Sequence, residues 1–255
     1  MTLIHGASAP LRCLIAGASG GIGLAFVEAL LARDEVGEVV ALARSATHSP
    51  ALAALQDTHP DRLRCTDIDL TRADEIAGLA EALKDAPLQL LLNASGLLHA
   101  EGLMPEKSLA QVRLDNLHRS FAINAFAPLL LVQALLPLLD SRTPAVIASL
   151  SARVGSIADN GLGGWYSYRA AKAAQNQLMR TLAVELRRTH PLATVLQLHP
   201  GTVDTALSAP FKARVPAGTL FTPAQSAAQL LQVIAAATPG DSGRFLAYDG
   251  TEIPW

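Results

Sequence analysis

Apolar runs and helical patterns alternate along the whole chain. Apolar runs of a few residues predict buried strands, whereas apolar residues three and four apart predict helices. The strands predicted in this way are residues 14–16, 38–43, 63–68, 88–92, 145–151, 192–198 and 243–248. Helices are predicted between them, at residues 22–31, 50–56, 73–84, 108–139, 165–188 and 223–236. Strict alternation predicts an α/β fold: one doubly wound (Rossmann-type) parallel sheet of about seven strands, with helices on both faces, in a single domain over residues 1–255.

One long segment near the carboxyl end, residues 206–222, has no clear period and contains Pro210, Pro216 and Gly218. Long irregular segments within a compact domain are often lids or binding loops. Polar or small residues also follow the predicted strands, at the edge of a parallel sheet where ligands bind. We therefore expect a ligand site at that edge, with residues 206–222 as its lid.

A glycine-rich turn, Gly17-Ala18-Ser19-Gly20-Gly21, separates the first strand from the first helix. Glycines let backbone N–H groups approach a ligand, and the helix that follows presents unpaired N–H groups and the positive end of its dipole. A phosphate group fits such a turn. The alternative is a tight strand-to-helix connection, and the spacing Gly17-x-x-x-Gly21-x-Gly23 departs from the G-x-G-x-x-G dinucleotide fingerprint. The turn by itself leaves both interpretations open.

The composition limits the possible partners. Half of the 255 residues are hydrophobic, and the net charge is −2, from 20 basic and 22 acidic residues that are scattered along the chain. No basic patch for nucleic acid is therefore expected. Cys13 and Cys65 lie far apart, which argues against a disulfide scaffold and suits a reducing compartment. The seven histidines show no paired spacing, so no metal site is expected.

The chain carries no pattern that predicts export or insertion into a membrane. Its amino terminus lacks the basic, apolar and cleavage regions of a signal peptide. The longest apolar stretch, residues 125–139, is too short to span a membrane and contains Pro128 and Pro137. We therefore expect a cytoplasmic protein without a membrane partner.

Tyr168 and Lys172 are four residues apart in a predicted helix, so they lie on one face of it, about one turn apart. A phenol has a pKa of about 10 and is a poor acid–base catalyst at neutral pH. An adjacent ammonium group stabilises the phenolate and lowers that pKa. The alternative is a solvated lysine beside an amphipathic tyrosine, but a glycine-rich turn in the same chain favours the catalytic interpretation.

With this pair, the chain resembles the short-chain dehydrogenase/reductase family over essentially its full length. Six motifs carry the resemblance: Gly17-x-x-x-Gly21-x-Gly23, Asn93-Ala94-Ser95-Gly96, Asn124, Ser151, Tyr168-x-x-x-Lys172 and Pro200-Gly201-x-Val203-x-Thr205. Each is weak alone, but six in the expected order on the expected elements form a specific signal. Residues 151–157, 163–170 and 249–255 are similar to the C-factor and carbonyl-reductase branch of that family.

The resemblance implies four catalytic residues, Asn124, Ser151, Tyr168 and Lys172. Tyr168 would exchange a proton with the substrate oxygen, while Lys172 lowers the pKa of Tyr168 and holds the nicotinamide ribose. Ser151 would hydrogen-bond the substrate oxygen where negative charge develops. Asn124 would fix a water that connects Lys172 to solvent.

The position of the catalytic serine depends on how the loop after the fifth strand is aligned. Counting along the strand from Val146 selects Ser151, whereas counting back from Gly155 places Ala152 at the same position. We favour Ser151, because the register of a strand is harder to shift than a loop, which can absorb one extra residue.

The resemblance also implies a nicotinamide dinucleotide cofactor. The pyrophosphate would lie on the glycine-rich turn, the adenosine on the ends of the third and fourth strands, and the nicotinamide amide on the end of the sixth. The residues expected to bind it are Gly17, Ser19, Gly21, Ile22, Gly23, Arg44, Ser45, Asp69, Leu70, Asn93, Ala94, Ser95, Gly96, Tyr168, Lys172, Pro200, Gly201, Val203 and Thr205. Two residues depart from the family pattern: Ala16 stands where threonine is common, and Ser95 replaces a small apolar residue.

The end of the second strand predicts which cofactor is used. An acidic residue there would bond the ribose hydroxyls of NAD, whereas an arginine would pair with the extra phosphate of NADP. The chain has Ala43-Arg44-Ser45 at this point and no carboxylate until Asp57. We therefore expect NADP(H) to be preferred over NAD(H). The alternative is a solvent-facing arginine at a strand end.

Together these features predict a reductase that moves hydride between NADP(H) and the carbonyl or alcohol group of a small molecule. The alternative, which the C-factor resemblance raises, is a nucleotide-binding signalling or regulatory protein with incidental turnover. The helical patterns at residues 108–139 and 165–188 are apolar beyond one narrow stripe. Similar family members pair through these two helices, so a homodimer or homotetramer is expected.

Overall fold

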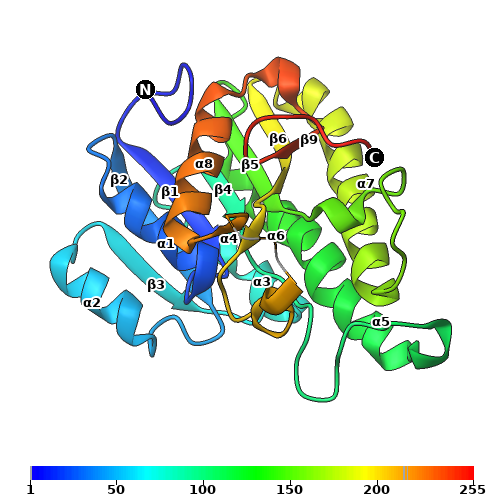
Figure 1. The fold of residues 1–255 in the computed structure, drawn as a ribbon. Coiled ribbons are helices and arrows are strands. Elements are labelled where there is room, and N and C mark those ends of the chain that lie inside the picture. The colour runs from blue at the N-terminus through cyan, green and yellow to red at the C-terminus, as the bar shows by residue number, and fades with distance from the viewer. Residues whose placement is uncertain (1, 215, 217) are drawn as a thin grey trace.

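The computed structural model describes residues 2–214, 216 and 218–255. Seven strands form one sheet in the order β3-β2-β1-β4-β5-β6-β9 (Figure 1), and all neighbouring pairs are parallel. The strands are β1 Leu11–Ala16, β2 Val36–Ala43, β3 Leu63–Asp67, β4 Leu90–Asn93, β5 Ala145–Leu150, β6 Ala193–His199 and β9 Arg244–Ala247. The predicted doubly wound parallel sheet is confirmed.

Helices cover both faces of the sheet, as predicted. Helices α1 Gly21–Leu31, α2 Pro50–Thr58 and α8 Pro223–Ala236 share one hydrophobic core with the sheet. Helices α3 Ala73–Ala77, α4 Leu79–Ala82, α6 Ala127–Leu135 and α7 Tyr166–Thr189 share a second core on the other face. Neighbouring strand residues enter opposite cores, Leu14 one and Ile15 the other. Burial on both faces explains why the strands are continuous apolar runs.

Shorter elements complete the chain. They are η1 Leu109–Gln111, α5 Leu114–Phe121, the π-helical η2 Ala122–Phe126, η3 Leu136–Leu138, η4 Arg153–Gly155, η5 Ala209–Arg214 and η6 Pro239–Asp241. A second, two-stranded sheet pairs β7 Thr202–Val203 with β8 Leu220–Phe221. The predicted lid, residues 206–222, is therefore less irregular than expected, because it contains η5 and β8; its residues 215 and 217 lie outside the described residues.

Two predicted helices are interrupted. The helix predicted at 73–84 is broken into α3 and α4 at Gly78, a residue type with low helix propensity. The helix predicted at 108–139 consists of η1, α5, η2, α6 and η3. Pro128 lies in the first turn of α6, where a missing N–H is tolerated, and the preceding turn is π-helical. Apolar periodicity identified these regions as helical but did not reveal the breaks.

The helical segment Leu114–Leu138 is long and apolar enough, by length and composition alone, to cross a membrane. It is longer than the apolar stretch 125–139 expected from the sequence, because it begins at Leu114 and continues through Pro128. Its side chains explain this composition: Leu131, Val132 and Leu135 lie in the second core, against the sheet. The carboxyl part of the segment, α6, therefore packs in a core of the α/β domain.

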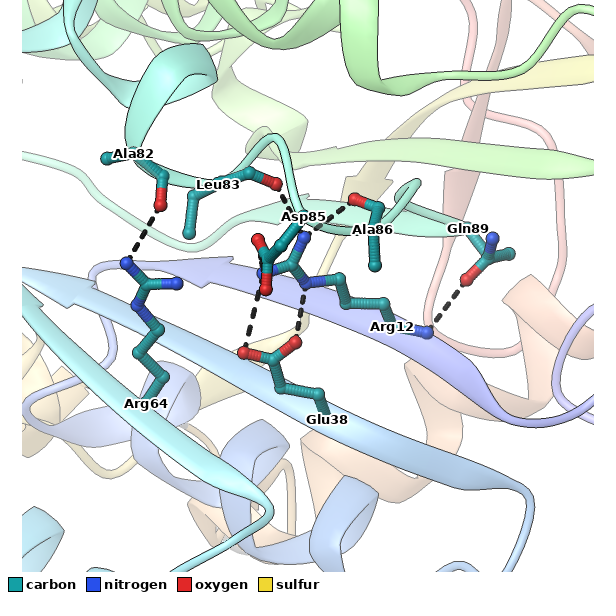
Figure 2. Close-up of polar contacts among 8 residues, drawn as sticks. All are labelled: Arg12, Glu38, Arg64, Ala82, Leu83, Asp85, Ala86 and Gln89. Atoms are coloured by element: carbon teal, nitrogen blue, oxygen red, sulfur yellow. Dashed lines mark hydrogen bonds and ion pairs between the residues drawn. The ribbon is translucent and has the colours of Figure 1, made fainter.

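A buried arginine organises the amino edge of the sheet (Figure 2). Arg12 in β1 is 3% exposed, and its Nη1 donates to the carbonyl oxygens of Leu83 at 2.7 Å and Ala86 at 2.6 Å. Its Nε lies 2.6 Å from a Glu38 carboxylate oxygen, and its Nη2 lies 3.0 Å from Asp85. Arg12 thus connects β1 and β2 to the loop that enters β4, at the edge opposite the carboxyl ends of the strands.

Candidate active site

Glycines shape the turn between β1 and α1. Gly17 has a φ of +81°, which side chains with a Cβ rarely adopt. A Cβ on Gly17 would lie 2.7 Å from the Ser95 backbone nitrogen, and a Cβ on Gly23 would lie 2.0 Å from the Gly17 carbonyl oxygen. Ser19 is exposed and Ile22 is half-buried. Among the described residues no side chain caps α1, and its first turn is free of acidic residues, so its N–H groups can receive an anion.

The end of β4 lies against this turn. Asn93 is fully buried, and its Oδ1 accepts hydrogen bonds from the Ser95 backbone nitrogen at 3.3 Å and the Ser95 hydroxyl at 2.5 Å. The Ala94 amide donates to a β1 carbonyl at 2.8 Å, and a Cβ on Gly96 would lie 3.4 Å from Asn124 Oδ1. Within the described part of the chain, Asn93 Nδ2 has no partner. An unpaired buried donor is costly, so it marks a place where a ligand acceptor fits.

The loop after β6 reaches the glycine-rich turn. Gly21 has a φ of +54°, and a Cβ there would lie 3.2 Å from Thr205 Cγ2. The Thr205 amide donates to the Ser208 hydroxyl at 3.2 Å. The structure therefore brings two motifs that are far apart in sequence into direct contact.

The first part of the same loop is held by α8 and β8. The Pro200 carbonyl accepts a hydrogen bond from the Ser226 hydroxyl at 2.9 Å. Gly201 has a φ of +75°, and a Cβ there would lie 2.7 Å from Phe221 Cε2. Val203 is buried in β7. Only glycine fits at position 201, because both the positive φ and the contact with Phe221 exclude a side chain.

The ends of β2 and β3 are neighbours in the sheet. Arg44 and Ser45 follow β2 and are exposed, whereas Leu70, which follows β3, is buried. Hydrogen bonds from Thr71, and then the positive charge of Arg44, lower the pKa of Asp69. The charge of Arg44 therefore acts on the residues predicted to receive the adenosine.

Tyr168 and Lys172 are buried one turn apart on α7. Lys172 Nζ lies 5.9 Å from the centroid of the Tyr168 ring, and it donates to the Leu150 carbonyl at 2.8 Å and to Gln175 Oε1 at 2.9 Å. Burial raises the pKa of Tyr168 and lowers the pKa of Lys172 to about 7. Burial therefore opposes the lowering of the Tyr168 pKa that was expected from the neighbouring charge.

Ser151 continues the ladder of β5, with its amide donating to the Leu198 carbonyl at 2.8 Å. Its side chain is almost fully buried, and its Oγ donates to Asn176 Oδ1 at 2.7 Å. This bond directs the hydroxyl toward α7, about two turns beyond Tyr168. In the structure the serine hydroxyl therefore has a partner of its own, and it would have to turn away from Asn176 to meet a substrate oxygen.

Asn124 connects the loop after β4 to the start of α7. Its Oδ1 accepts from the Leu97 amide at 3.0 Å, and its Nδ2 donates to the Leu97 carbonyl at 2.8 Å and to the Ser120 hydroxyl at 3.2 Å. The Ser120 hydroxyl donates to the Ser167 carbonyl at 3.2 Å. Because Pro128 has no N–H, the α-helical bond to the Asn124 carbonyl cannot form. The side chain is fully used by the protein, whereas the carbonyl lacks its usual helical donor.

The sequence analysis missed Glu106, whose carboxylate anchors the start of α7. Glu106 is 2% exposed. One of its carboxylate oxygens accepts from the Ser167 amide at 3.1 Å, and the other accepts from the Ser167 hydroxyl. The Trp165 amide donates to the Glu106 carbonyl at 2.5 Å. A carboxylate is favourable at the amino end of a helix, and here it fixes the residue that precedes Tyr168.

Aromatic rings connect Tyr168 to the predicted lid, a contact that the sequence did not predict. The Trp165 ring lies 6.3 Å from the Tyr168 ring and 4.9 Å from that of Phe211, which belongs to the predicted lid. His99 contacts the same lid, with its Nε2 3.0 Å from the Ala206 carbonyl oxygen. Their separation in sequence hid this cluster, since no local pattern joins residues of three loops.

Comparisons with known proteins identify the family of the chain. A family model described as short chain dehydrogenase matches residues 12–215. The chain is 34% identical over 188 residues to the 1-hydroxy-2-glutathionyl-2-methyl-3-butene dehydrogenase of Rhodococcus sp. (strain AD45). This alignment covers 74% of this chain and 78% of that protein. It is also 38% identical over 169 residues to the C-signal protein of Myxococcus xanthus, and this alignment covers 66% of this chain and 93% of that protein.

Similarity to a solved structure extends over nearly the whole chain. The NADPH-bound carbonyl reductase from chicken fatty liver superimposes with a TM-score of 0.82 at 30% sequence identity. The alignment covers 97% of this chain and 100% of that structure. The likeness therefore includes both the sheet and the loops at its carboxyl edge.

Proposed function

The chain belongs to the short-chain dehydrogenase family, and from this premise we propose that it is an NADP(H)-dependent oxidoreductase that reduces a carbonyl group, or oxidises an alcohol, with Tyr168 as general acid and base. The observation that carries the proposal is the placement of Tyr168 and Lys172, side by side and buried, on α7. The helix begins at residues fixed to the loop after β4. That loop also meets the glycine-rich turn.

The residues at the carboxyl edge fit a dinucleotide. The glycine-rich turn packs against the end of β4 with no room for a side chain at Gly17, no described side chain caps α1, and Asn93 Nδ2 is a buried donor in need of an acceptor. When bound, the cofactor would supply or accept the hydride. The residues proposed to hold it are Gly17, Ser19, Gly21, Ile22, Gly23, Arg44, Ser45, Asp69, Leu70, Asn93, Ala94, Ser95, Gly96, Tyr168, Lys172, Pro200, Gly201, Val203 and Thr205.

Tyr168 suits the role of proton donor. Its phenol is protonated at neutral pH, so its hydroxyl can donate a proton to the oxygen of a carbonyl as that oxygen gains negative charge. Burial raises the pKa of Tyr168, which opposes this transfer and makes the neighbouring Lys172 charge the group that must favour it. In the opposite direction, Lys172 would stabilise the phenolate that accepts the proton. The Asn124 carbonyl, which lacks an α-helical donor, would hold the water that links Lys172 to solvent. Ser151 would add a hydrogen bond to the substrate oxygen.

Arg44 supports the proposed preference for NADP(H). Its exposed guanidinium follows β2, and its charge acts on Asp69. Replacing Arg44 with Asp should lower the ratio of kcat/KM for NADPH to kcat/KM for NADH by about tenfold or more, so that NADH becomes the preferred cofactor. The change removes a charged partner of the NADP phosphate and adds a repulsive one. Steady-state kinetics with both cofactors measures this. Arg142→Asp, in an exposed loop that enters β5 at the opposite edge, is the matched control. A wild type that favours NADH would contradict the assignment of Arg44.

Oxidation of NADPH in the presence of a carbonyl tests the proposed activity. The panel should include aldehydes, ketones and α-diketones, with loss of nicotinamide absorbance as the readout. Turnover that depends on both substrate and protein supports the proposal. Absence of turnover across the panel, in a protein that binds neither cofactor, would contradict it.

A second candidate function rests on the 38% identity to the C-signal protein. In this alternative the chain is a nucleotide-binding signalling or regulatory protein in which turnover is incidental. Cofactor binding by fluorescence, measured beside the carbonyl panel, separates the two. Tight NADPH binding without turnover of any carbonyl favours the signalling role.

A further inference from the structure

Two buried glutamines lie behind the Tyr168–Lys172 pair. Gln175, on α7, is fully buried, and Gln197, in the middle of β6, is 2% exposed. Gln175 is three residues beyond Lys172 and therefore shares its face of the helix. Gln197 lies in β6 between Leu196 and Leu198, which are both buried. Two primary amides in the core require hydrogen-bond partners.

The two amides form one chain of hydrogen bonds that ends on the lysine. Lys172 Nζ donates to Gln175 Oε1 at 2.9 Å, Gln175 Nε2 donates to Gln197 Oε1 at 2.9 Å, and Gln197 Nε2 donates to the Leu196 carbonyl at 3.1 Å. Gln175 Nε2 also approaches the Leu150 carbonyl at 3.3 Å, the same carbonyl that receives Lys172 Nζ. Each amide is therefore held at both its oxygen and its nitrogen.

Chemistry fixes the direction of this chain. An ammonium group is only a donor, so the atom of Gln175 that faces Lys172 must be its oxygen. The Gln175 nitrogen must then point away and donate, which requires the oxygen of Gln197 to face it. The Gln197 nitrogen is left to donate to the Leu196 carbonyl. Both amides are thus oriented by, and toward, one buried positive charge.

We propose that Gln175 is a positioning residue that receives the Lys172 ammonium, and that Gln197 holds the Gln175 amide in the orientation this requires. The proposal rests on the proposed function for its catalytic meaning, but its geometry does not depend on turnover. It assigns to the glutamine pair the task of keeping Lys172 charged and in place behind Tyr168, where the described acceptors of Lys172 Nζ are an amide oxygen and a carbonyl oxygen.

Burial makes such acceptors necessary. The pKa of Lys172 falls to about 7 because its ammonium is taken out of water, and hydrogen bonds to the charged form act in the opposite direction. The Gln175 oxygen and the Leu150 carbonyl are the acceptors that the structure provides. Loss of one of two acceptors should therefore lower the pKa further, and a carboxylate in place of the amide should raise it.

Other ionisable groups lie near this part of α7. Tyr168 shares the helix face, at 5.9 Å from its ring centroid to Lys172 Nζ. Arg153 on η4 is paired with Asp159, and His199 at the end of β6 has a pKa of about 4, mainly because of burial. On α5, Asp115, His118 and Arg119 are exposed or partly exposed, and Glu106 contacts Ser167. Burial lowers the Lys172 pKa, and the groups that contact Lys172 Nζ are the Gln175 amide and the Leu150 carbonyl, so these contacts are the ones to test.

The test is a direct titration of Lys172 in the intact protein. The chain has four lysines, so ¹³C-lysine labelling gives few signals, and the one missing in Lys172→Arg is that of Lys172. In Gln175→Met the pKa of Lys172 should fall by about one pH unit, as expected for loss of a hydrogen bond to a charged group. In Gln197→Met it should fall by less, and in Gln175→Glu it should rise above the wild-type value.

Controls separate this role from a general effect on folding. Gln177→Met changes an exposed glutamine of the same helix and should leave the Lys172 pKa unchanged. Circular dichroism checks that each variant is folded. If Gln175→Met does not fold, the Lys172 pKa values in Gln175→Glu and Gln197→Met still test the proposal. Opposite shifts in the Met and Glu variants support the proposal, whereas an unchanged Lys172 pKa in all folded variants overturns it.

Catalysis provides a second, independent readout. If the proposed function holds, the pH midpoint of kcat should move in each variant in the same direction as the Lys172 pKa. If the wild type turns over no carbonyl or alcohol, the proposed function fails, while the titration still decides whether the glutamines position Lys172. A shifted pKa with an unmoved kcat profile would overturn the catalytic part of the inference.

Discussion

Tyr168 is the residue on which the proposed chemistry depends most directly. Tyr168→Phe removes the hydroxyl and keeps the ring that packs against Trp165. The change should lower kcat by about 10²- to 10⁴-fold, the usual contribution of a general acid or base, and leave NADPH affinity nearly unchanged. Rapid kinetics and cofactor titration measure the two effects. Tyr166→Phe, two positions earlier and partly exposed, is the control, and comparable activity in Tyr168→Phe would remove that residue from its role.

Ser151 poses a sharper question, because its hydroxyl is bonded to Asn176. If it turns to the substrate oxygen during reaction, Ser151→Ala should lower kcat by about 10²- to 10³-fold, as for loss of an oxyanion donor. If the bond to Asn176 is its whole role, the variant should lose stability and keep its activity. Steady-state kinetics beside thermal unfolding distinguishes the two. A large loss of activity in Ser149→Ala or Ser156→Ala instead would show that the register is wrong.

At the scale of elements, the amino edge of the sheet depends most clearly on Arg12, which connects β1 and β2 to the loop that enters β4. Arg12→Leu leaves the Glu38 carboxylate and two carbonyl groups without their buried partner. The free energy of unfolding should fall by about 3–5 kcal/mol, the range for breaking a buried ion pair. Urea denaturation measures it. Arg64→Leu removes one hydrogen bond to the neighbouring Ala82 carbonyl (Figure 2) and should cost about 0.5–1.5 kcal/mol; equal losses would contradict the role given to Arg12.

The interruptions in the long helical segment show how elements respond to the site. The π-helical turn η2 places Asn124 against Leu97, and the amide of Asn124 then holds the loop after β4. An uninterrupted α-helix would need an N–H at Pro128, which proline lacks. π-Helical turns are often found at functional sites, which agrees with the water-binding role proposed for Asn124.

For the whole molecule, we predict self-association through α5 and α7. Leu114 on α5 and Val184 on α7 are 65% and 51% exposed, and Phe126 is 50% exposed. Exposed apolar side chains on helices that pack against each other are typical of an interface. Light scattering at micromolar concentration should give at least twice the monomer mass. Val184→Asp should reduce that mass, whereas Leu192→Asp, which lies outside both helices, should not; a monomeric wild type would contradict the prediction.

Much of the architecture was predictable because its causes are local. A strand buried on both faces must be apolar throughout, and a helix on the sheet must repeat its apolar residues with the helical period. The seven strands and the long helices α7 and α8 follow from these two rules. The spacing of Tyr168 and Lys172 also fixes their common face before any packing is known.

The sequence by itself therefore determined the fold class, the order of elements and the pairing of Tyr168 with Lys172. Only the tertiary structure decided which groups from distant segments meet. Glu106 reaches Ser167 across 61 residues, and Gln175 reaches Gln197 across 22. The reason is physical: periodicity reports the burial of a face, whereas the hydrogen-bond partner and pKa of a buried polar side chain depend on which other element is packed against it.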